Sequence, residues 1–253
     1  MRKFLFLFCC SIMSYFVLPA QIVNIEDSRK KIDSTGFYGH IDIALNIVKN
    51  SKRILTFRTS SRIDILQKRG AWLAVVNYRA LQSRSNKLIN DGFFHFRYGH
   101  FLNKKVTLET FSQLQHNRQL RIGVRWLIGA GPRFLVFKQG KNSVYLGILY
   151  MYEYDQLIAS PIFFRDHRLS NYLSFHLRLA SQLTFASTSY YQPLIKNFNS
   201  SRFSSVNTLS FRVGRRINFR MQLSLSYDAR LAKETVGVPA LVYSFTNGLR
   251  WEF

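Results

Sequence analysis

The chain ends in the stretch Val242-Tyr243-Ser244-Phe245-Thr246-Asn247-Gly248-Leu249-Arg250-Trp251-Glu252-Phe253. Apolar and polar residues alternate along it up to a terminal aromatic residue, and this period of two places successive side chains on opposite faces of a β-strand. An apolar face toward lipid and a polar face toward an interior are typical of the closing strand of an outer-membrane β-barrel. An edge strand of a soluble domain would show the same alternation, so the rest of the chain decides between the two.

The aromatic residues of this last strand also resemble the signal by which outer-membrane barrels are delivered for assembly. We expect four residues to form that signal: Tyr243, Phe245, Trp251 and Phe253. The opposite face is expected to point into the barrel with Ser244, Thr246, Arg250 and Glu252. The barrel-assembly machinery is therefore an expected partner.

A secretory signal peptide is predicted over residues 1–20. Arg2 and Lys3 precede an apolar run over residues 4–17, and Leu18-Pro19-Ala20 ends with a small residue suited to cleavage. A retained transmembrane helix would need roughly 20 apolar residues, and this run is shorter. We therefore expect export, a periplasmic N-terminal arm over residues 21–35 and a barrel over residues 36–253, placed in the outer membrane of a Gram-negative bacterium.

The only two cysteines, Cys9 and Cys10, lie within the predicted signal peptide. They come too early, beside bulky residues, for a lipidation site. The mature chain is therefore expected to have no disulfide and no thiolate metal site, although its compartment would be oxidising.

The chain is strongly basic, with 36 Lys and Arg against 13 Asp and Glu and a formal charge of +23. In a cytosolic protein this balance would suggest nucleic acid, but the basic residues are spread over turns and alternate strand positions, and no nucleic-acid motif accompanies them. For an exported monomeric barrel, the expected partners are outer-membrane lipid and lipopolysaccharide headgroups. No internal run is long enough for a transmembrane helix.

Alternation of the same kind recurs along the mature chain, in segments close to the roughly 9 to 11 residues that a tilted strand needs to cross the hydrocarbon. Helical spacing fits none of the clearest segments. The sequence therefore predicts an all-β fold, an antiparallel transmembrane β-barrel of about 12 strands, over residues 36–48, 53–66, 71–82, 91–101, 105–116, 119–137, 143–155, 168–179, 182–192, 203–214, 216–229 and 239–253.

Three of these segments show the alternation best, and their lipid-facing residues can be named. The expected lipid face of the first carries Phe37, Ile41, Ile43, Leu45 and Ile47. That of the sixth carries Leu120, Ile122, Val124, Trp126, Ile128 and Ala130. That of the eleventh carries Ile217, Phe219, Met221, Leu223, Leu225 and Tyr227.

The lengths of the connections agree with an even number of strands. With both termini in the periplasm, connections after even strands are periplasmic and short, and those after odd strands are extracellular and can be long. Long connections are predicted over residues 82–90, 156–167, 193–202 and 230–238. Asn247-Gly248 is a strong hairpin signal, but a turn there would leave a final strand too short to span, so the last strand is kept intact.

Several ordered motifs resemble a known family. Leu108-Glu109-Thr110-Phe111-Ser112-Gln113-Leu114-Gln115-His116-Asn117, followed by Arg125-Trp126-Leu127-Ile128-Gly129-Ala130-Gly131-Pro132-Arg133, is similar to the central signature of the YdiY-like salt-induced outer-membrane proteins, the domain of unknown function four-eight-one. Met151-Tyr152-Glu153 and Tyr190-Tyr191-Gln192-Pro193 match further along, and the form looks most like members from the Bacteroidetes. It departs from the family pattern at Ser201-Arg202-Phe203. The resemblance implies an outer-membrane barrel and carries no activity.

Charged side chains are predicted on the interior face of the barrel. A hairpin centred at residues 117–118 would place Glu109 opposite Arg125 and would bring Arg121 onto the same face. Such pairs would form charge-assisted hydrogen bonds across a narrow interior. Asp42 is likewise expected close to Arg58. The predicted interior charge network comprises Glu109, Arg121, Arg125, Asp42, Arg58, Glu153 and Arg178.

Two interpretations of these interior charges remain open. In the first, paired charges stabilise the barrel by linking side chains in its interior, because small barrels fill their interiors with side chains. An excess of arginine over acid would instead make a constriction for anions. The wider inward set is Arg58, Arg62, Arg97, Arg121, Arg125, Arg178, Arg212, Arg220 and Arg250 against Asp42, Asp64, Glu109, Glu153, Asp228 and Glu252. Glycines on the same face are expected to relieve crowding or to bend strands: Gly123, Gly129, Gly131 and Gly147.

Catalysis is the competing class of function. Ser174 and His176 share one face of a predicted strand, as a nucleophile and a base would, but this spacing is a frequent coincidence in a serine-rich chain and no acid is recognisable to orient the histidine. None of the six histidines forms a metal-ligand motif. We expect no catalytic residue, no metal and no cofactor. The predicted function is an envelope-stress or structural barrel or a small-solute pore, and the alternative is an outer-membrane lipase or protease with its site in the interior or the loops.

Overall fold

A computed structural model of the chain describes residues 35–49, 53–83, 86–214, 217–235 and 237–251. The predicted signal peptide and nearly all of the predicted N-terminal arm lie outside these residues, as do Glu252 and Phe253. No helix among the described residues is long and apolar enough to span a membrane.

The described chain is almost entirely β-structure. Twelve strands follow one another, and a single short helix, α2 (Ala229–Glu234), interrupts them before the last. The strands are β1 (Gly36–Lys49), β2 (Arg53–Gln67), β3 (Gly70–Ser83), β4 (Asn86–Phe101), β5 (Val106–Asn117), β6 (Ile122–Gln139), β7 (Asn142–Leu157), β8 (Phe163–Arg178), β9 (Leu183–Leu194), β10 (Asn197–Arg212), β11 (Ile217–Asp228) and β12 (Leu241–Trp251).

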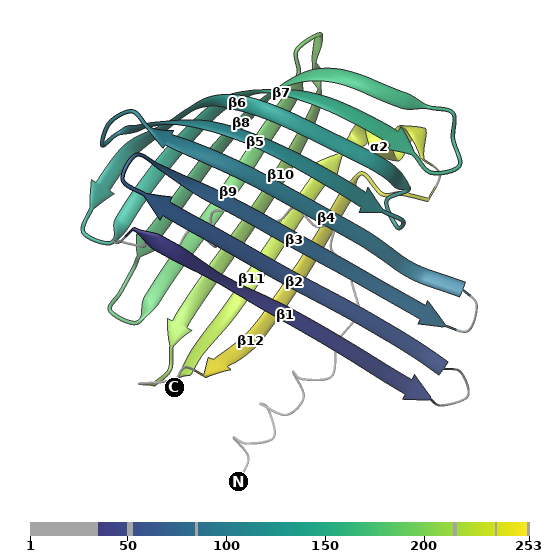
Figure 1. Ribbon diagram of the computed structural model, residues 1–253, viewed down its shortest axis with the longest axis horizontal. Coiled ribbons are helices and arrows are strands. Elements are labelled where there is room, and N and C mark those ends of the chain that lie inside the picture. The colour runs from purple at the N-terminus through teal and green to yellow at the C-terminus, as the bar shows by residue number, and fades with distance from the viewer. Residues whose placement is uncertain (1–34, 50–52, 84–85, 215–216, 236, 252–253) are drawn as a thin grey trace, which may run out of the picture.

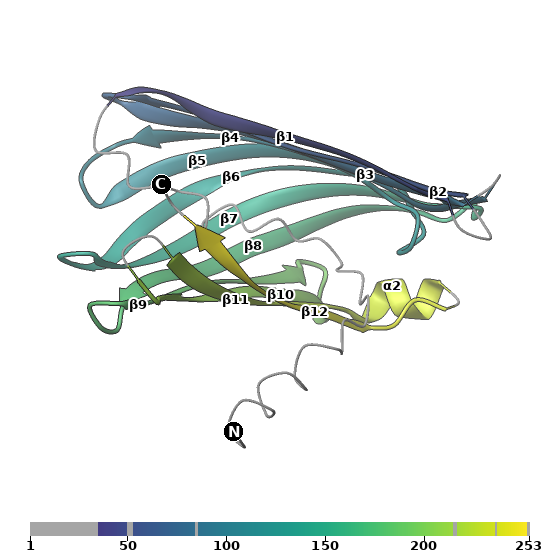
Figure 2. The same ribbon diagram turned by 90° about the horizontal axis from the view of Figure 1, so that it is seen from below.

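These strands form one antiparallel sheet in which every strand pairs with its neighbours in sequence, from β1 to β12 (Figure 1). The sheet curls around a common interior, with β1 and β12 as its two edges (Figure 2). The predicted all-β fold class, with twelve antiparallel strands in one sheet, is confirmed. Asn247 and Gly248 pair with Met221 and Arg220 without interruption, so the last strand is continuous as expected.

The outer face of the sheet, the one turned away from this interior, carries exposed apolar side chains. In β1, Ile41, Ile43 and Leu45 are 63% to 69% exposed, as the alternation predicts. Tyr243 and Phe245 of β12 are likewise more than half exposed. Large apolar side chains in contact with solvent would be unfavourable over so wide an area, so this face is suited to an apolar environment.

One part of the predicted lipid face is wrong. Val124, Trp126 and Ile128 of β6 are exposed on the outer face as expected, but Ile122 is fully buried. An irregularity in the ladder with β7, between Ile122 and Val124, interrupts the alternation at that point. Because a bulge inserts one extra residue, the side chains before it turn to the other face. Leu120 packs against the same buried cluster as Ile122.

The predicted long connections are also largely wrong. β3 and β4 are separated only by residues 84–85, β9 and β10 only by residues 195–196, and β7 and β8 by residues 158–162. The expected strands had roughly 9 to 11 residues, but these strands have 12 to 16, so their polar ends are β-structure instead of loop. These strand ends are rich in serine and asparagine, which are common in loops, and the sequence therefore predicted connections there. The connection over residues 229–240, which contains α2, remains long.

Aromatic side chains from several strands pack together on the interior face. One buried cluster consists of Phe111, Leu127, Leu149, Met151, Tyr172 and Tyr190. A Cβ atom at Gly147 would lie 2.1 Å from the ring of Tyr172, and one at Gly129 would lie 2.6 Å from the ring of Phe111. These two glycines therefore relieve crowding, as the sequence predicted, by letting large rings lie flat against the wall.

Candidate functional site

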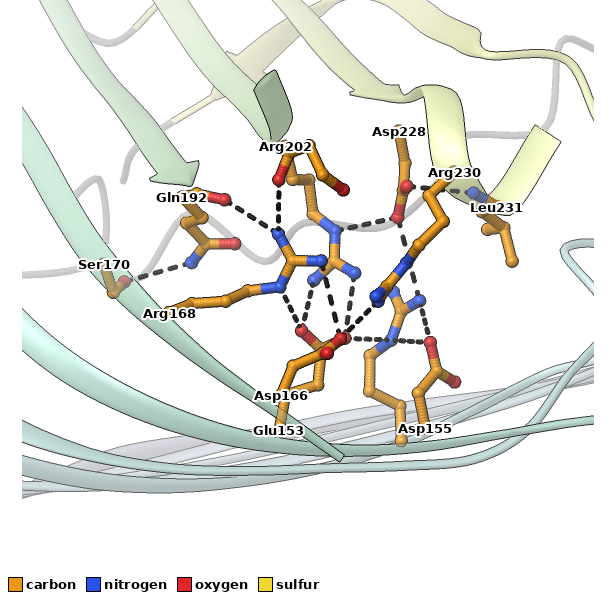
Figure 3. A network of polar contacts seen from close by, with 12 residues as sticks. Glu153, Asp155, Asp166, Arg168, Ser170, Gln192, Arg202, Asp228, Arg230 and Leu231 are labelled. Atoms are coloured by element: carbon orange, nitrogen blue, oxygen red, sulfur yellow. Dashed lines mark hydrogen bonds and ion pairs between the residues drawn. The ribbon is translucent and has the colours of Figure 1, made fainter. Parts of the chain in front are cut away.

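The most distinctive polar feature is a group of charged side chains from five strands and α2, which we call the interior network. Its members are Arg125, Glu153, Asp155, Asp166, Arg168, Arg202, Asp228 and Arg230. β6 to β8 contribute five of them and meet the side chains of β10, β11 and α2 across the interior (Figure 3). The inward positions follow from strand alternation, since Glu153 and Asp155 flank the outward Tyr154.

Glu153 lies at the centre of the interior network and is completely buried. Its carboxylate is 2.8 Å from Arg168 Nε, 2.8 Å from Arg202 Nη2 and 3.3 Å from Arg125 Nε. Arg202 comes from β10, which β8 and β9 separate from β7 in the sheet. A carboxylate removed from water is stable only with such partners, and three guanidinium groups supply them.

Asp228 links the interior network to the helix. It is the N-cap residue of α2, where its Oδ1 atom accepts a hydrogen bond from the Leu231 amide at 3.1 Å. Its Oδ2 atom accepts a hydrogen bond from Arg202 Nε at 2.8 Å. An N-cap carboxylate stabilises the helix start by accepting such an amide bond. The position of α2 is therefore tied to the charges beneath it.

The charges of the interior network balance. Arg125 donates from Nε to Asp155 at 3.1 Å, and Arg230 Nη2 lies 2.6 Å from Asp166. Four arginines thus face four carboxylates, each within reach of an opposite charge. A balanced set of this kind carries no strong local field for drawing anions inward.

A second group of charges surrounds Glu109, which is also completely buried. Its carboxylate lies 3.3 Å from Arg97 Nη1 and 3.5 Å from Arg133 Nη1. The hydroxyl of Tyr172, which reaches from β8 to β5 across the interior, donates a hydrogen bond to it at 2.7 Å. The Arg97 guanidinium lies 5.7 Å and 5.8 Å from the ring centres of Phe111 and Tyr172.

The predicted pairing of Glu109 with Arg125 is wrong. Glu109 faces Gly131 in the ladder, and Arg125 faces Gln115. The turn between β5 and β6 lies at residues 118–121 rather than being centred at residues 117–118, so the ladder is shifted. Arg121, expected on the interior face, instead ends this turn with a φ of 53° and is exposed. Glu109 and Arg125 are both interior, but in different charge groups.

Three further residues expected in the network lie elsewhere. Asp42 pairs with Ser60 and lies 3.8 Å from His40 in an exposed position. Arg58 is exposed opposite Ala44 in β1. Arg178 donates to the Ser181 carbonyl at 2.9 Å in the turn after β8. Asp42 and Arg58 do share one face of the sheet, but none of the three belongs to the interior network.

The sequence reasoning missed Asp155, Asp166, Arg168, Arg202 and Arg230 as members of the network. Asp166, Arg202 and Arg230 fall within ranges that the sequence predicted as long connections, whereas the first two lie in β8 and β10 and the third lies in α2. One usable signal was present in this aromatic-rich stretch. Asp166 and Arg168 are two residues apart, as are Glu153 and Asp155, and this spacing places both members of each pair on one face of a strand.

The helix α2 lies at the end of the sheet remote from the C-terminal end of β12 (Figure 2), and it joins the interior network through Arg230 and its N-cap residue Asp228. Leu231 is buried with Ile122, Leu157 and Val238. The Arg230 guanidinium lies 4.2 Å from the centre of the Phe164 ring. A cavity of about 100 Å³ remains beside the network, and Leu231 and Val238 are part of its lining.

Comparison of the sequence with models of known protein families finds one match. A sequence profile described as "Protein of unknown function, DUF481" matches residues 56–238. The chain belongs to this family. The matched range contains all eight residues of the interior network. No curated protein matches the chain.

Among solved structures, the DUF481 chain is similar to two porins. A NanC porin is 15% identical with a TM-score of 0.48, and the match covers 86% of this chain and 98% of that one. A KdgM porin is 11% identical with a TM-score of 0.41, with the same coverage of both chains.

The alternative catalytic pair can be located in the DUF481 fold. Ser174 is buried on β8, where its hydroxyl accepts a hydrogen bond from Thr188 at 3.0 Å. His176 lies two residues further on and is exposed. Among the described residues, no group of three or more His, Cys, Asp or Glu side chains is arranged to hold a metal ion.

Proposed function

We propose that this DUF481 protein is a monomeric outer-membrane β-barrel whose interior is closed by its own side chains, and that it supports the envelope as a scaffold rather than as an open diffusion pore. The observation that carries the proposal is the 2.8 Å ion pair between Arg202 of β10 and Glu153 of β7. The strands β7 and β10 are not neighbours in the sheet, so these two side chains meet by extending into the barrel interior, and they fill the space there. A twelve-stranded barrel has a wider interior than an eight-stranded one, and the long side chain of arginine can reach across it.

Membrane placement is supported by the exposed apolar outer face of the sheet and by the predicted signal peptide. The alternating last strand, with its aromatic residues, supports recognition by the barrel-assembly machinery. The excess of Lys and Arg supports contact with anionic lipid and lipopolysaccharide headgroups. The finer resemblance to YdiY-like salt-induced proteins suggests that the scaffold serves the envelope under osmotic stress.

The experiment is conductance of the refolded protein in planar lipid bilayers. We expect the wild type to insert without steady channel openings. A variant in which residues 229–240 are replaced by a short Gly-Ser linker should open a conducting path, because it removes the segment that joins the interior network through Arg230. A Gly-Ser replacement of residues 102–105, in the turn between β4 and β5, is the control and should stay closed, because this turn has no part in the cluster around Leu231. Steady openings of the wild type would contradict the proposal.

A second candidate, a small-solute pore that opens when α2 moves, is favoured by the cavity that Leu231 and Val238 help to line. Leu157 and Leu231 share a buried cluster, so a disulfide between Leu157→Cys and Leu231→Cys would hold α2 in place. The pore hypothesis predicts intermittent wild-type openings that this disulfide abolishes and a reductant restores. The scaffold hypothesis predicts no such openings.

Lipase and protease assays on the same refolded sample test the enzymatic alternative. We expect no turnover. Turnover that Ser174→Ala abolishes, with unchanged folding, would favour an enzyme instead.

A further inference from the structure

We propose that the outer face of β5 to β8 is a binding site for a single membrane lipid that carries a phosphate monoester, with one acyl chain in a groove over β5 and β6 and the phosphate beside Arg165 and His167. This inference rests on the proposed membrane location. It adds a specific site to what would otherwise be general contact with lipid.

The groove is built from small side chains between aromatic ones. Thr110 and Ser112 of β5 and Ala130 of β6 form its floor. Phe96 of β4 stands on one side, and Tyr150 of β7 stands on the other. About 410 Å³ of space lies between these walls. Larger residues at the three floor positions would fill it, so the hollow is a consequence of the sequence.

The groove has the shape and polarity that an acyl chain needs. Its walls stand on β4 and β7 and its floor on the two strands between them, so it runs along the strand direction, which is also the direction that crosses the membrane. The Trp126 indole donates a hydrogen bond to Ser112 Oγ at 3.1 Å. This bond pairs one of the two hydroxyl groups on the floor, and most of the remaining lining is apolar or aromatic.

A basic and aromatic cluster continues from the groove toward the end of the sheet where α2 lies. His167 lies beside both Tyr150 and Tyr152, with ring centres 5.9 Å and 5.4 Å apart, and it shares a hydrogen bond with the Tyr150 hydroxyl. Arg165 lies 5.4 Å from the centre of the Phe163 ring. Tyr150 therefore lines the groove and also contacts the basic cluster.

The acids of β7 and β8 are absent from this outer surface because they turn inward. Glu153, Asp155 and Asp166 all belong to the interior network. Arg165 and His167 alternate with Asp166 and point the opposite way, where both are exposed. On these two strands all three carboxylates point inward, whereas Arg165 and His167 point outward. An exposed arginine with a histidine beside it, next to an apolar groove, is complementary to a phosphate attached to an acyl chain.

The test is native mass spectrometry of the refolded full chain in detergent, with three probes that separate the two parts of the site. Phosphatidic acid has both phosphate monoester and acyl chains, diacylglycerol lacks the phosphate, and glycerol phosphate lacks the chains. We expect one phosphatidic acid per protein, retained about tenfold better than diacylglycerol, and no retained glycerol phosphate. Equal retention of phosphatidic acid and diacylglycerol would overturn the role of Arg165 and His167.

Variants assign the binding to this surface. Arg165→Gln should weaken retention of phosphatidic acid without affecting diacylglycerol, and Ala130→Leu should weaken both by filling the groove. The controls are Lys138→Gln, at the opposite end of β6, and Ala80→Leu, on the outer face of β3. Binding that Arg165→Gln and Ala130→Leu leave unchanged would overturn the site.

Insertion into phosphatidylcholine vesicles, measured by flotation of the same sample, separates the two proposals. Insertion without preference for phosphatidic acid would overturn the lipid site and leave the barrel. Failure of the wild type to insert would overturn both.

Discussion

Arg202 on β10 lies 2.8 Å from Glu153 on β7, although β8 and β9 separate the two strands in the sheet. The ion pair therefore links two strands across the interior instead of two neighbouring strands of the sheet. Both groups are buried, and each has further partners of opposite charge. Removing one partner of such a pair is costly, because the remaining charge stays buried without compensation.

Replacement of Glu153 by Gln tests how dry this interior is. The amide keeps the volume of the side chain but removes the charge that three arginines share, so we expect a loss of about 3 to 5 kcal/mol in the free energy of unfolding. Urea unfolding in lipid vesicles provides the measurement. Asp42→Asn, at an exposed position, should leave stability unchanged. A loss below about 1 kcal/mol for Glu153→Gln would indicate screening by water and an open interior.

The hydrogen bond from Tyr172 to Glu109 supplies a second test of a closed interior. Tyr172→Phe removes one neutral donor from a buried carboxylate that two arginines still neutralise. We expect a loss of about 1.5 to 3 kcal/mol, smaller than for Glu109→Gln. The two losses should add less than fully in the double variant, because Glu109→Gln already weakens the charge-assisted bond that Tyr172→Phe removes. Additive losses would mean that the bond does not form in the membrane.

The fold was predictable because a sheet with one apolar and one polar face has a simple pattern in its strands. The alternation that identified β1 and β12 depends only on a side-chain period of two and an apolar surrounding, and it needs no information from distant residues. Twelve strands could therefore be located before their partners were known. The exceptions occur where this pattern breaks, at the irregularity near Ile122 and at the polar ends of β4 and β10.

The interior network was less predictable because it depends on register. A displaced turn between β5 and β6 was enough to separate Glu109 from Arg125 and to carry Arg121 out of the interior. Contacts such as Arg202 with Glu153 also depend on the curvature of the whole sheet, which no local pattern records. Glu153 could be recognised as inward from alternation, but its three partners come from three different strands.

Gly147 provides a prediction about packing that is independent of charge. A methyl group there would overlap the Tyr172 ring, with its carbon 2.1 Å away, so the ring or the strand must shift. We expect Gly147→Ala to destabilise the barrel by about 1 to 3 kcal/mol in urea unfolding. Gly248→Ala in β12 is the matched control, because nothing lies within 4 Å of the added carbon. Equal stability of the two variants would place Tyr172 away from the wall.

The predicted assembly signal can be tested by deletion. Removal of residues 251–253 should leave export intact and abolish outer-membrane insertion, because it shortens β12 and removes the terminal aromatic residue. Phe253→Tyr, which keeps the aromatic ring, should insert normally. Cell fractionation and heat-modifiable migration report both steps. Normal insertion of the truncated chain would refute the signal.

The two edges of the sheet lead to the last prediction. Within the described residues, no ladder joins β1 to β12. Unpaired backbone N–H and C=O groups are strongly unfavourable in hydrocarbon, so a chain that spans a membrane must pair these edges. We therefore expect β1 and β12 to be hydrogen-bonded neighbours in the bilayer.

Disulfide cross-linking measures this closure directly, because both cysteines of the chain lie in the predicted signal peptide. Ile43→Cys on the outer face of β1 can be combined in turn with Leu241→Cys, Tyr243→Cys, Phe245→Cys and Leu249→Cys on the same face of β12. One combination should cross-link in vesicles as readily as Ser60→Cys with Asn77→Cys, which are ladder partners in β2 and β3. If only the β2–β3 control cross-links, the edges do not meet. Disulfide-linked dimers would show instead that a second copy of the chain covers them, and that the protein is not a monomer.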